Sequence, residues 1–152
     1  MLNTSPNKAM LIVDTDEAFR DCLASDMRKR GFDVRTCATV QESMATIEAN
    51  SPRYAIIDIR LGEDNGLVVL KALNQSSSEV RSVILTSHGD ARTAVAAIKL
   101  GACDYLLKPS SAEEIIGALV GSADAYLDAP EPPVSVVKSQ SGYFEESLDA
   151  VA

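Results

Sequence analysis

Apolar and polar positions along this chain repeat one pattern five times: a short apolar run is followed by a longer segment with helical spacing. The apolar runs cover residues 9–13, 32–37, 54–57, 80–85 and 103–107. The first run and residues 55–57 of the third are continuously apolar, which is typical of strands buried on both faces, and the second run alternates. Helical spacing is found at residues 17–30, 39–50, 67–73, 91–100 and 111–127, and Thr39 and Ser111 can cap the second and fifth of these helices. A glycine-rich loop is expected at residues 62–66 and a polar loop at residues 74–79. The pattern predicts five strands that alternate with five helices.

This alternation predicts an α/β fold, because parallel strands need crossovers and right-handed crossovers place helices on both faces of the sheet. We expect a flavodoxin-like, doubly wound, five-stranded parallel sheet in the order 2-1-3-4-5. The pattern ends near residue 127. Residues 128–152 contain a stiff Ala-Pro-Glu-Pro-Pro sequence, five acidic side chains and one basic one. We therefore expect one domain over 1–127 and an acidic tail over 128–152 that is mostly disordered or docks on a partner.

Composition narrows the class of protein. The net charge of -8 argues against direct nucleic-acid binding, which requires a basic surface. The three cysteines, Cys22, Cys37 and Cys103, lack CxxC spacing, so we expect reduced core residues rather than disulfides or a zinc site. No apolar run approaches the roughly 18 residues of a membrane span, and the first residues lack a targeting pattern. These features predict a cytoplasmic protein without a membrane segment.

Polar side chains follow four of the five predicted strands. Asp14 and Asp16 follow the first strand, Asp58 the third, Thr86 the fourth and Lys108 the fifth. Because the carboxyl ends of parallel strands meet at one edge, we expect these side chains to converge. Clustered carboxylates attract a hard cation such as Mg²⁺, and a lysine and a threonine hydroxyl beside them suit a phosphoryl group on Asp58. For Asp58 taken alone, a turn-capping role is the alternative.

Taken together, residues 9–127 resemble the receiver domain of two-component response regulators. Asp58 matches the phosphoacceptor, and Thr86 and Lys108 match the threonine and lysine that accompany it. Tyr105 matches the aromatic residue that changes rotamer with Thr86, and Lys108-Pro109 matches a junction that is usually cis. The sequences Leu-Gly-Glu-Asp-Asn-Gly and Thr-Ala-Val-Ala-Ala-Ile-Lys-Leu-Gly-Ala resemble regulators of the RegA, PrrA and ActR type.

The resemblance implies a function. The protein would accept a phosphoryl group on Asp58 from a histidine kinase or phosphotransfer protein, using Mg²⁺. Thr86 and Tyr105 would then switch a protein-protein surface formed by the fourth helix, the fifth strand and the fifth helix, through which a homodimer is plausible. Such a protein is not an enzyme beyond self-phosphorylation and autodephosphorylation.

The resemblance also implies a metal site and two tuning positions. The Mg²⁺ ligands would be Asp14, Asp58 and the backbone carbonyl of Arg60, with Asp16 or Thr15 as a further ligand. Arg60 and His88 occupy the variable positions that tune the lifetime of the acyl phosphate, and for His88 a structural or solvent-exposed role is the alternative.

Two features depart from the family pattern. A second acid normally follows the first strand directly, but here Thr15 follows Asp14. Since a hydroxyl is a poorer ligand for a hard cation than a carboxylate, we expect weaker Mg²⁺ binding, with Asp16 compensating in part. The second departure is that no basic helix-turn-helix follows the proline-containing linker.

Two alternatives stay open at this stage. Asp14-Thr15-Asp16 also fits the opening of the haloacid-dehalogenase phosphatases, although Ala18 departs from that motif and Asp58 would have no use there. The second alternative is a receiver-like interaction module that is independent of phosphorylation because its metal site is weakened.

Overall fold

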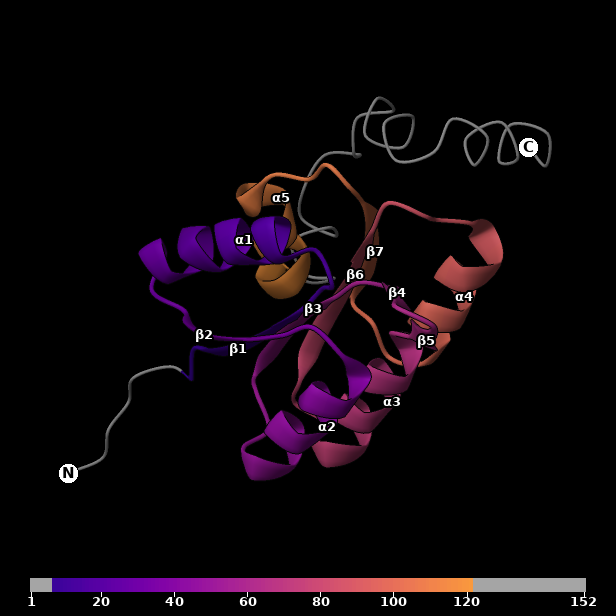
Figure 1. The fold of residues 1–152 in the computed structure, drawn as a ribbon, viewed down its shortest axis with the longest axis horizontal. Helices are drawn as coiled ribbons and strands as arrows, with labels where there is room; N and C mark the ends of the chain where they lie inside the picture. The colour runs from indigo at the N-terminus through magenta and orange to yellow at the C-terminus, as the bar shows by residue number, and fades with distance from the viewer. Residues whose placement is uncertain (1–6, 122–152) are drawn as a thin grey trace.

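Five parallel strands form the centre of the protein in a computed structural model that describes residues 7–121 (Figure 1). Their order is β2-β1-β3-β6-β7. Their bounds are Ala9–Val13 for β1, Asp33–Cys37 for β2, Tyr54–Ile57 for β3, Arg81–Thr86 for β6 and Asp104–Leu107 for β7. Counted within this sheet alone, the order is 2-1-3-4-5, so the predicted flavodoxin-like topology is confirmed. The predicted tail over 128–152 and the end of the last predicted helix lie outside the described residues.

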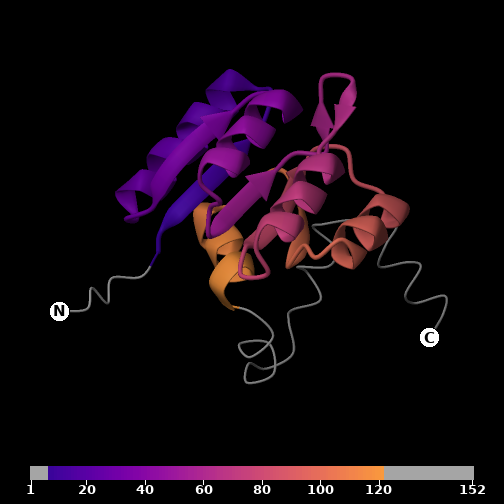
Figure 2. The ribbon, with the colours of Figure 1, turned by 90° about the horizontal axis from the view of Figure 1, so that it is seen from below.

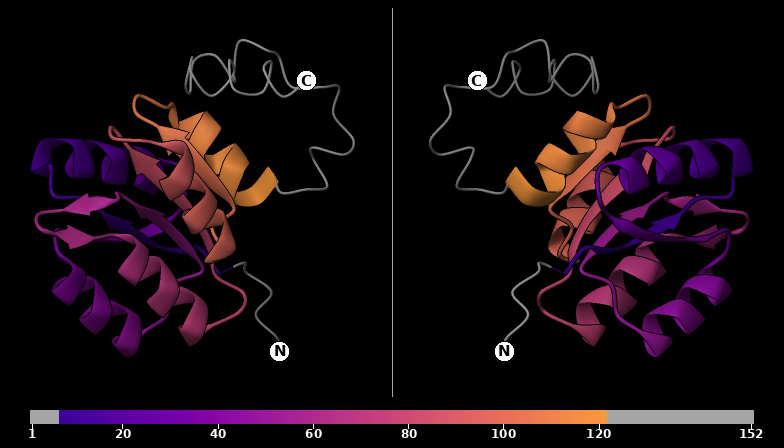
Figure 3. Two further views of the ribbon diagram at one scale, coloured as in Figure 1. Left: turned by 90° about the vertical axis from the view of Figure 1, so that its right-hand side faces the viewer. Right: turned by 90° about the vertical axis from the view of Figure 1, so that its left-hand side faces the viewer.

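Helices cover both faces of the sheet. One face carries α1 (Glu17–Lys29), α5 (Ala112–Ile116) and the π-helical turn η1 (Gly117–Gly121). The opposite face carries α2 (Val40–Ala49), α3 (Leu67–Ser76) and α4 (Ala91–Lys99). Figure 3 shows α1 and α5 on the side of the sheet opposite to α2 and α3. Burial of one apolar stripe from each helix against the strands is the main source of stability in such a layered domain.

Two apolar clusters, one on each face, form the core. On the α1 and α5 face, side chains such as Met27, Ile56 and Leu119 are almost completely buried. On the other face, Leu70 and Ile84 are equally buried. The central strands contribute to both clusters because successive side chains point to opposite faces. This explains why the sequence of these strands is continuously apolar.

Strand register brings the ends of the central strands level. Val13 in β1 lies opposite Ile57 in β3, and the backbone N–H of Asp58 donates to the Val13 carbonyl at 2.9 Å. At the other side of the sheet, the N–H of Lys108 donates to the Thr86 carbonyl at 2.9 Å. Residues that directly follow these strands therefore emerge at the same edge.

Local sequence signals set the helix ends. Asp16, Thr39, Asp90 and Ser111 cap the N-termini of α1, α2, α4 and α5 with their side chains, and Ser111 forms a reciprocal capping box with Glu114. The predicted caps at Thr39 and Ser111 are thus confirmed. These helices begin within a residue of the predicted positions.

The structure differs from the prediction in three local features. The predicted glycine-rich loop contains a small antiparallel hairpin of β4 (Arg60–Leu61) and β5 (Asp64–Asn65), which projects from the body in Figure 2. Gly62 turns this hairpin with a φ of 67°. Helix α3 continues to Ser76, although a loop was predicted from residue 74, because Asn74 donates to the Leu100 carbonyl and is held in the helix. The last helix passes into a π-helical turn at Gly117.

The prediction that all three cysteines lie in the core was wrong for two of them. Cys37 is buried, whereas Cys22 and Cys103 are exposed. Cys22 directly precedes the buried stripe of α1, which begins at Leu23, so it points away from the sheet. Within residues 7–121, no helix has both the length and the apolar character that crossing a membrane requires.

Candidate functional site

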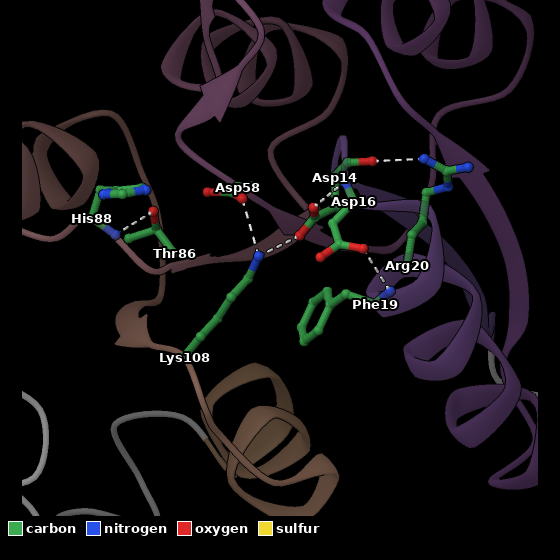
Figure 4. Close-up of polar contacts among 8 residues, drawn as sticks. All are labelled: Asp14, Asp16, Phe19, Arg20, Asp58, Thr86, His88 and Lys108. Carbon is green, nitrogen blue, oxygen red and sulfur yellow. Dashed lines mark hydrogen bonds and ion pairs between the residues drawn. The ribbon is translucent and has the colours of Figure 1, made fainter.

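Four polar side chains from four strand ends meet at the carboxyl edge of the sheet (Figure 4). Asp14 follows β1, Asp58 follows β3, Thr86 is the last residue of β6 and Lys108 follows β7. Asp14, Asp58 and Thr86 are all buried. The structure therefore brings together the four residues that the sequence placed at separate strand ends.

Lys108 joins the two aspartates. Its Nζ lies 2.7 Å from Oδ2 of Asp14 and 3.1 Å from Oδ2 of Asp58. Burial by itself lowers the pKa of the Lys108 ammonium, but the hydrogen bonds to Asp14 and Asp58 outweigh this effect and raise the pKa above its ordinary value. Lys108 is therefore a cation, and it balances part of the negative charge of the two carboxylates.

The other oxygen of Asp58 is available. Oδ1 is buried and has no hydrogen-bond partner among the described residues. A buried acceptor without a partner costs about 1–3 kcal/mol, so such an atom favours a cation or a donor. The structure thus presents one carboxylate oxygen that is held by Lys108 and one that can interact with a ligand.

The residue that follows the β4–β5 hairpin, Gly66, packs closely against the backbone of Asp58. The chain returns so closely that a Cβ at Gly66 would overlap the backbone carbonyl oxygen of Asp58. The N–H of Gly66 also donates to the Ile59 carbonyl at 2.6 Å. Only glycine permits this approach without displacing the Asp58 backbone.

The loop after β1 is ordered by its own acidic residues. Oδ1 of Asp14 accepts from the N–H of Asp16 at 2.9 Å, and Oδ1 of Asp16 accepts from the N–H of Phe19 at 3.1 Å. Arg20 Nη1 donates to the Asp14 carbonyl at 2.8 Å. The Asp16 carboxylate is therefore engaged as the cap of α1, while the Thr15 side chain is exposed.

The residues present fit a divalent cation of the Mg²⁺ type. The carboxylates of Asp14 and Asp58, one with an unpartnered oxygen, are oxygen donors of the kind that Mg²⁺ accepts together with water. Within residues 7–121, no three His, Cys, Asp or Glu side chains are grouped to hold a metal ion by themselves. Mg²⁺, which commonly binds through one or two carboxylates and retains several waters, does not need such a group.

Thr86 and Tyr105 lie on the neighbouring strands β6 and β7. Oγ1 of Thr86 accepts from the backbone N–H of His88 at 3.2 Å, and the His88 side chain is exposed (Figure 4). Tyr105 is half-buried and packs against the core beneath α4. A Cβ at Gly89 would overlap Leu107 and approach the Tyr105 ring, so the loop after β6 lies directly against that ring.

The structure also shows the position of Arg60 and the geometry of the Lys108-Pro109 peptide bond. Arg60 begins β4, two residues after Asp58, and its side chain is exposed. The Lys108-Pro109 peptide bond is cis, as the resemblance implied.

No pattern in the sequence singled out Phe19 or Arg20 as part of this site. Lys108 Nζ lies 4.2 Å from the centroid of the Phe19 ring, and Arg20 ties α1 to the Asp14 backbone. Both residues lie in the first turn of α1, immediately after the Asp16 cap. Their place in the first turn of a helix that starts beside the site is the signal that could have identified them. Using this signal requires the direction of the helix to be known.

Comparisons with known proteins agree with this geometry. Residues 10–120 match the response regulator receiver domain family. The photosynthetic apparatus regulatory protein RegA of Rhodobacter capsulatus is 44% identical over 129 residues, which cover 85% of this chain and 70% of that protein. The alignment confirms the predicted resemblance to regulators of the RegA type.

Two solved structures show the same fold. The crystal structure of a Burkholderia pseudomallei response regulator with a phosphorylated aspartic acid, calcium ion and citrate is similar with a TM-score of 0.74 at 31% identity, covering 80% of this chain and 72% of that one. The solution structure of the beryllofluoride-activated NtrC4 receiver domain dimer has a TM-score of 0.70 at 26% identity, covering 78% and 98%.

These matches are to receivers, and nothing in them favours a phosphorylation-independent module. The family match spans residues 10–120 and includes all four converging side chains. This chain belongs to the response regulator receiver domain family of two-component signalling.

Proposed function

We propose that Asp58 accepts a phosphoryl group from the phosphohistidine of a histidine kinase or phosphotransfer protein. The observation that carries this proposal is the pair of Asp58 oxygens: Oδ2 is held by Lys108, and Oδ1 is buried without a partner in the described residues. Receiver domains accept phosphoryl groups from histidine kinases, and the related structure from Burkholderia pseudomallei contains a phosphorylated aspartic acid. Self-phosphorylation and autodephosphorylation are part of the proposal.

The transfer requires the Asp58 carboxylate to act as a nucleophile. One of its oxygens forms a bond to phosphorus as the bond between phosphorus and the histidine nitrogen breaks, and the imidazole leaves with the electron pair. The Lys108 ammonium, already beside Asp58, then pairs with a phosphoryl oxygen. Thr86 exchanges its contact with His88 for a donated hydrogen bond to a second oxygen.

Mg²⁺, when bound, supplies charge neutralisation for the phosphoryl oxygens. We assign its protein ligands to Asp14, Asp58 and the backbone carbonyl of Arg60. Asp16 is a weaker candidate because its carboxylate caps α1, and Thr15 offers only a hydroxyl. We therefore expect lower Mg²⁺ affinity than a carboxylate at position 15 would provide.

The proposed switch links Thr86 to Tyr105. If Thr86 turns toward the phosphoryl group, the space that it leaves beside β7 becomes available to the half-buried Tyr105 ring. Arg60 and His88, both exposed next to the site, are proposed to tune the lifetime of the acyl phosphate by controlling the approach of water.

The proposed output surface consists of α4, β7 and α5. Val95 and Ile98, three residues apart on α4, are 52% and 49% exposed and form an apolar stripe. The related NtrC4 receiver was solved as a dimer. A homodimer or a downstream protein is proposed to cover this stripe after phosphorylation, with residues 1–127 as the receiver unit and 128–152 as a separate acidic segment.

Intact-mass measurement after incubation with acetyl phosphate and Mg²⁺ tests the proposal. We expect the wild-type protein to gain the mass of one phosphoryl group and Asp58→Asn to gain none. Thr15→Asp should form the adduct faster at low Mg²⁺ concentration because a carboxylate is the better ligand. An adduct that persists in Asp58→Asn would contradict the proposal. So would the absence of an adduct from wild type, and an adduct formed only by Thr15→Asp would show that the acceptor is kept but the metal site is too weak to use it.

A further inference from the structure

The ammonium group of Lys108 is enclosed on three sides. Two sides are formed by Asp14 and Asp58, whose oxygens lie 2.7 and 3.1 Å from Nζ. The third side is the ring of Phe19, whose centroid lies 4.2 Å from the same nitrogen. An ammonium over a ring face is attracted by the negative face of the aromatic quadrupole. Figure 4 shows the Phe19 ring on the side of Lys108 that is away from Thr86.

The position of Phe19 is set by the same acidic loop that provides Asp14. The carboxylate of Asp14 accepts a hydrogen bond from the N–H of Asp16, and the carboxylate of Asp16 accepts one from the N–H of Phe19. Arg20, the next residue, donates to the Asp14 carbonyl. These contacts fix the first turn of α1 relative to the end of β1, so the Phe19 ring has a defined place beside Lys108.

Lysine has a flexible four-carbon stem and three donors without a preferred direction, so two carboxylates alone leave its ammonium free to shift between them. We propose that Phe19 is a positioning residue for phosphoryl transfer: its ring confines the Lys108 ammonium between Asp14 and Asp58, where it meets the incoming phosphoryl oxygens. The inference rests on the proposed function of Asp58 and extends it to α1.

A purely structural role for Phe19 predicts a different behaviour. The ring is half-buried and also packs against the core cluster on the α1 and α5 face. If only this packing matters, leucine should replace phenylalanine with little effect on the site. If the ring face matters, leucine should fail and tyrosine should succeed, because tyrosine retains the π-face.

The chain contains a matched control. Lys8 Nζ lies 4.6 Å from the centroid of the Phe32 ring, at the opposite end of β1 from the site. Phe32 is more deeply buried than Phe19, so Phe32→Leu loses an aromatic ring, a cation–π contact and core packing together. Any general effect of losing a phenylalanine should therefore be seen in this variant.

The first measurement is the rate of adduct formation with acetyl phosphate and Mg²⁺ in the full chain, well below the melting temperature of each variant. We expect Phe19→Leu to slow the rate about three- to tenfold, which corresponds to the usual strength of a partly desolvated cation–π contact. Phe19→Tyr should restore the wild-type rate, and Phe32→Leu should leave it unchanged. Equal rates for wild type and Phe19→Leu would overturn the inference.

The second measurement is the NMR chemical shift of the Lys108 ε-methylene protons in the unphosphorylated protein. A ring face beside Nζ shifts these protons upfield, so the shift should be present in wild type and Phe19→Tyr and lost in Phe19→Leu. This signal does not depend on phosphoryl transfer. If wild type forms no adduct, the proposed function fails, and an unchanged Lys108 signal in Phe19→Leu overturns the placement of the ring independently.

Discussion

The Asp16 carboxylate accepts a hydrogen bond from the N–H of Phe19 and so satisfies one of the free donors in the first turn of α1. An acidic side chain there also interacts favourably with the helix dipole. Its neighbour Asp14 has a different environment, because it is buried and paired to Lys108. Two aspartates separated by one residue thus have separate roles in the structure: Asp16 caps α1, and Asp14 pairs with Lys108 at the proposed metal site.

A pair of substitutions separates these functions at Asp16. Asp16→Ala should lower the free energy of unfolding by about 1 kcal/mol, because the cap is lost. Asp16→Asn should stay close to wild type, because asparagine caps as well as aspartate does. Urea unfolding measures both values. If Asp16 were instead an Mg²⁺ ligand, Asp16→Asn would weaken Mg²⁺ binding several-fold, and titration of Mg²⁺ against the variant would reveal this.

At the scale of elements, the site depends on close packing between β3 and the start of α3. Gly66 lies against the Asp58 carbonyl, so Gly66→Ala should lower the free energy of unfolding by about 1–3 kcal/mol through overpacking. Gly117→Ala provides the control, because a Cβ at this helical position meets nothing within 4 Å. It should raise the free energy of unfolding by about 0.5–1 kcal/mol. Two glycines with the same response to alanine would contradict the packing argument.

The first residue of β7 should make stability depend on pH. Burial raises the pKa of the Asp104 carboxyl, and the hydrogen bond from the N–H of Tyr105 only partly opposes this. Because the folded state then binds the proton more tightly than the unfolded state, the contribution of Asp104 is favourable below its ordinary pKa and is lost as the pH rises through the raised value.

Asp104→Asn should therefore be more stable than wild type at neutral pH, since its amide oxygen can keep the Tyr105 contact without a buried charge. The difference should shrink as the pH falls below the ordinary pKa of aspartate. Chemical unfolding of both proteins over a pH series measures this. A difference that does not vary with pH would mean that charge at Asp104 is not the cause.

In the molecule as a whole, exposed apolar side chains lie both on the proposed output surface and outside it. Three of the exposed large apolar side chains in residues 7–121 lie on α3 and α4, and Val68 on α3 is 48% exposed, much like Val95. The two valines therefore offer a matched comparison of surfaces, one outside and one inside the proposed output face.

Val95→Asp should prevent a phosphorylation-dependent dimer while leaving adduct formation on Asp58 intact, because a charge on the apolar stripe opposes burial. Val68→Asp, the same change at similar exposure, should leave the dimer unaffected. Sedimentation velocity with and without acetyl phosphate and Mg²⁺ distinguishes the cases. The proposed dimer face would be wrong if Val95→Asp assembled like wild type.

The order of the elements, the caps of α2 and α5 and the four strand-end residues Asp14, Asp58, Thr86 and Lys108 could all be predicted from the sequence. These features follow from signals that are local in the chain, namely apolar runs and capping residues, together with the general rule that right-handed crossovers bring parallel strand ends to one edge. The residues that form the site could therefore be predicted from the sequence.

The contacts between side chains from distant parts of the chain could not be predicted in this way. Lys108 is 94 residues from Asp14 and 50 from Asp58 in sequence, and no local pattern specifies that it bridges both. The ring of Phe19 beside Lys108 and the close approach of Gly66 to Asp58 depend on how whole elements pack. Contacts of this kind result from rotamers and distances between distant segments, which the periodicity of a sequence does not encode.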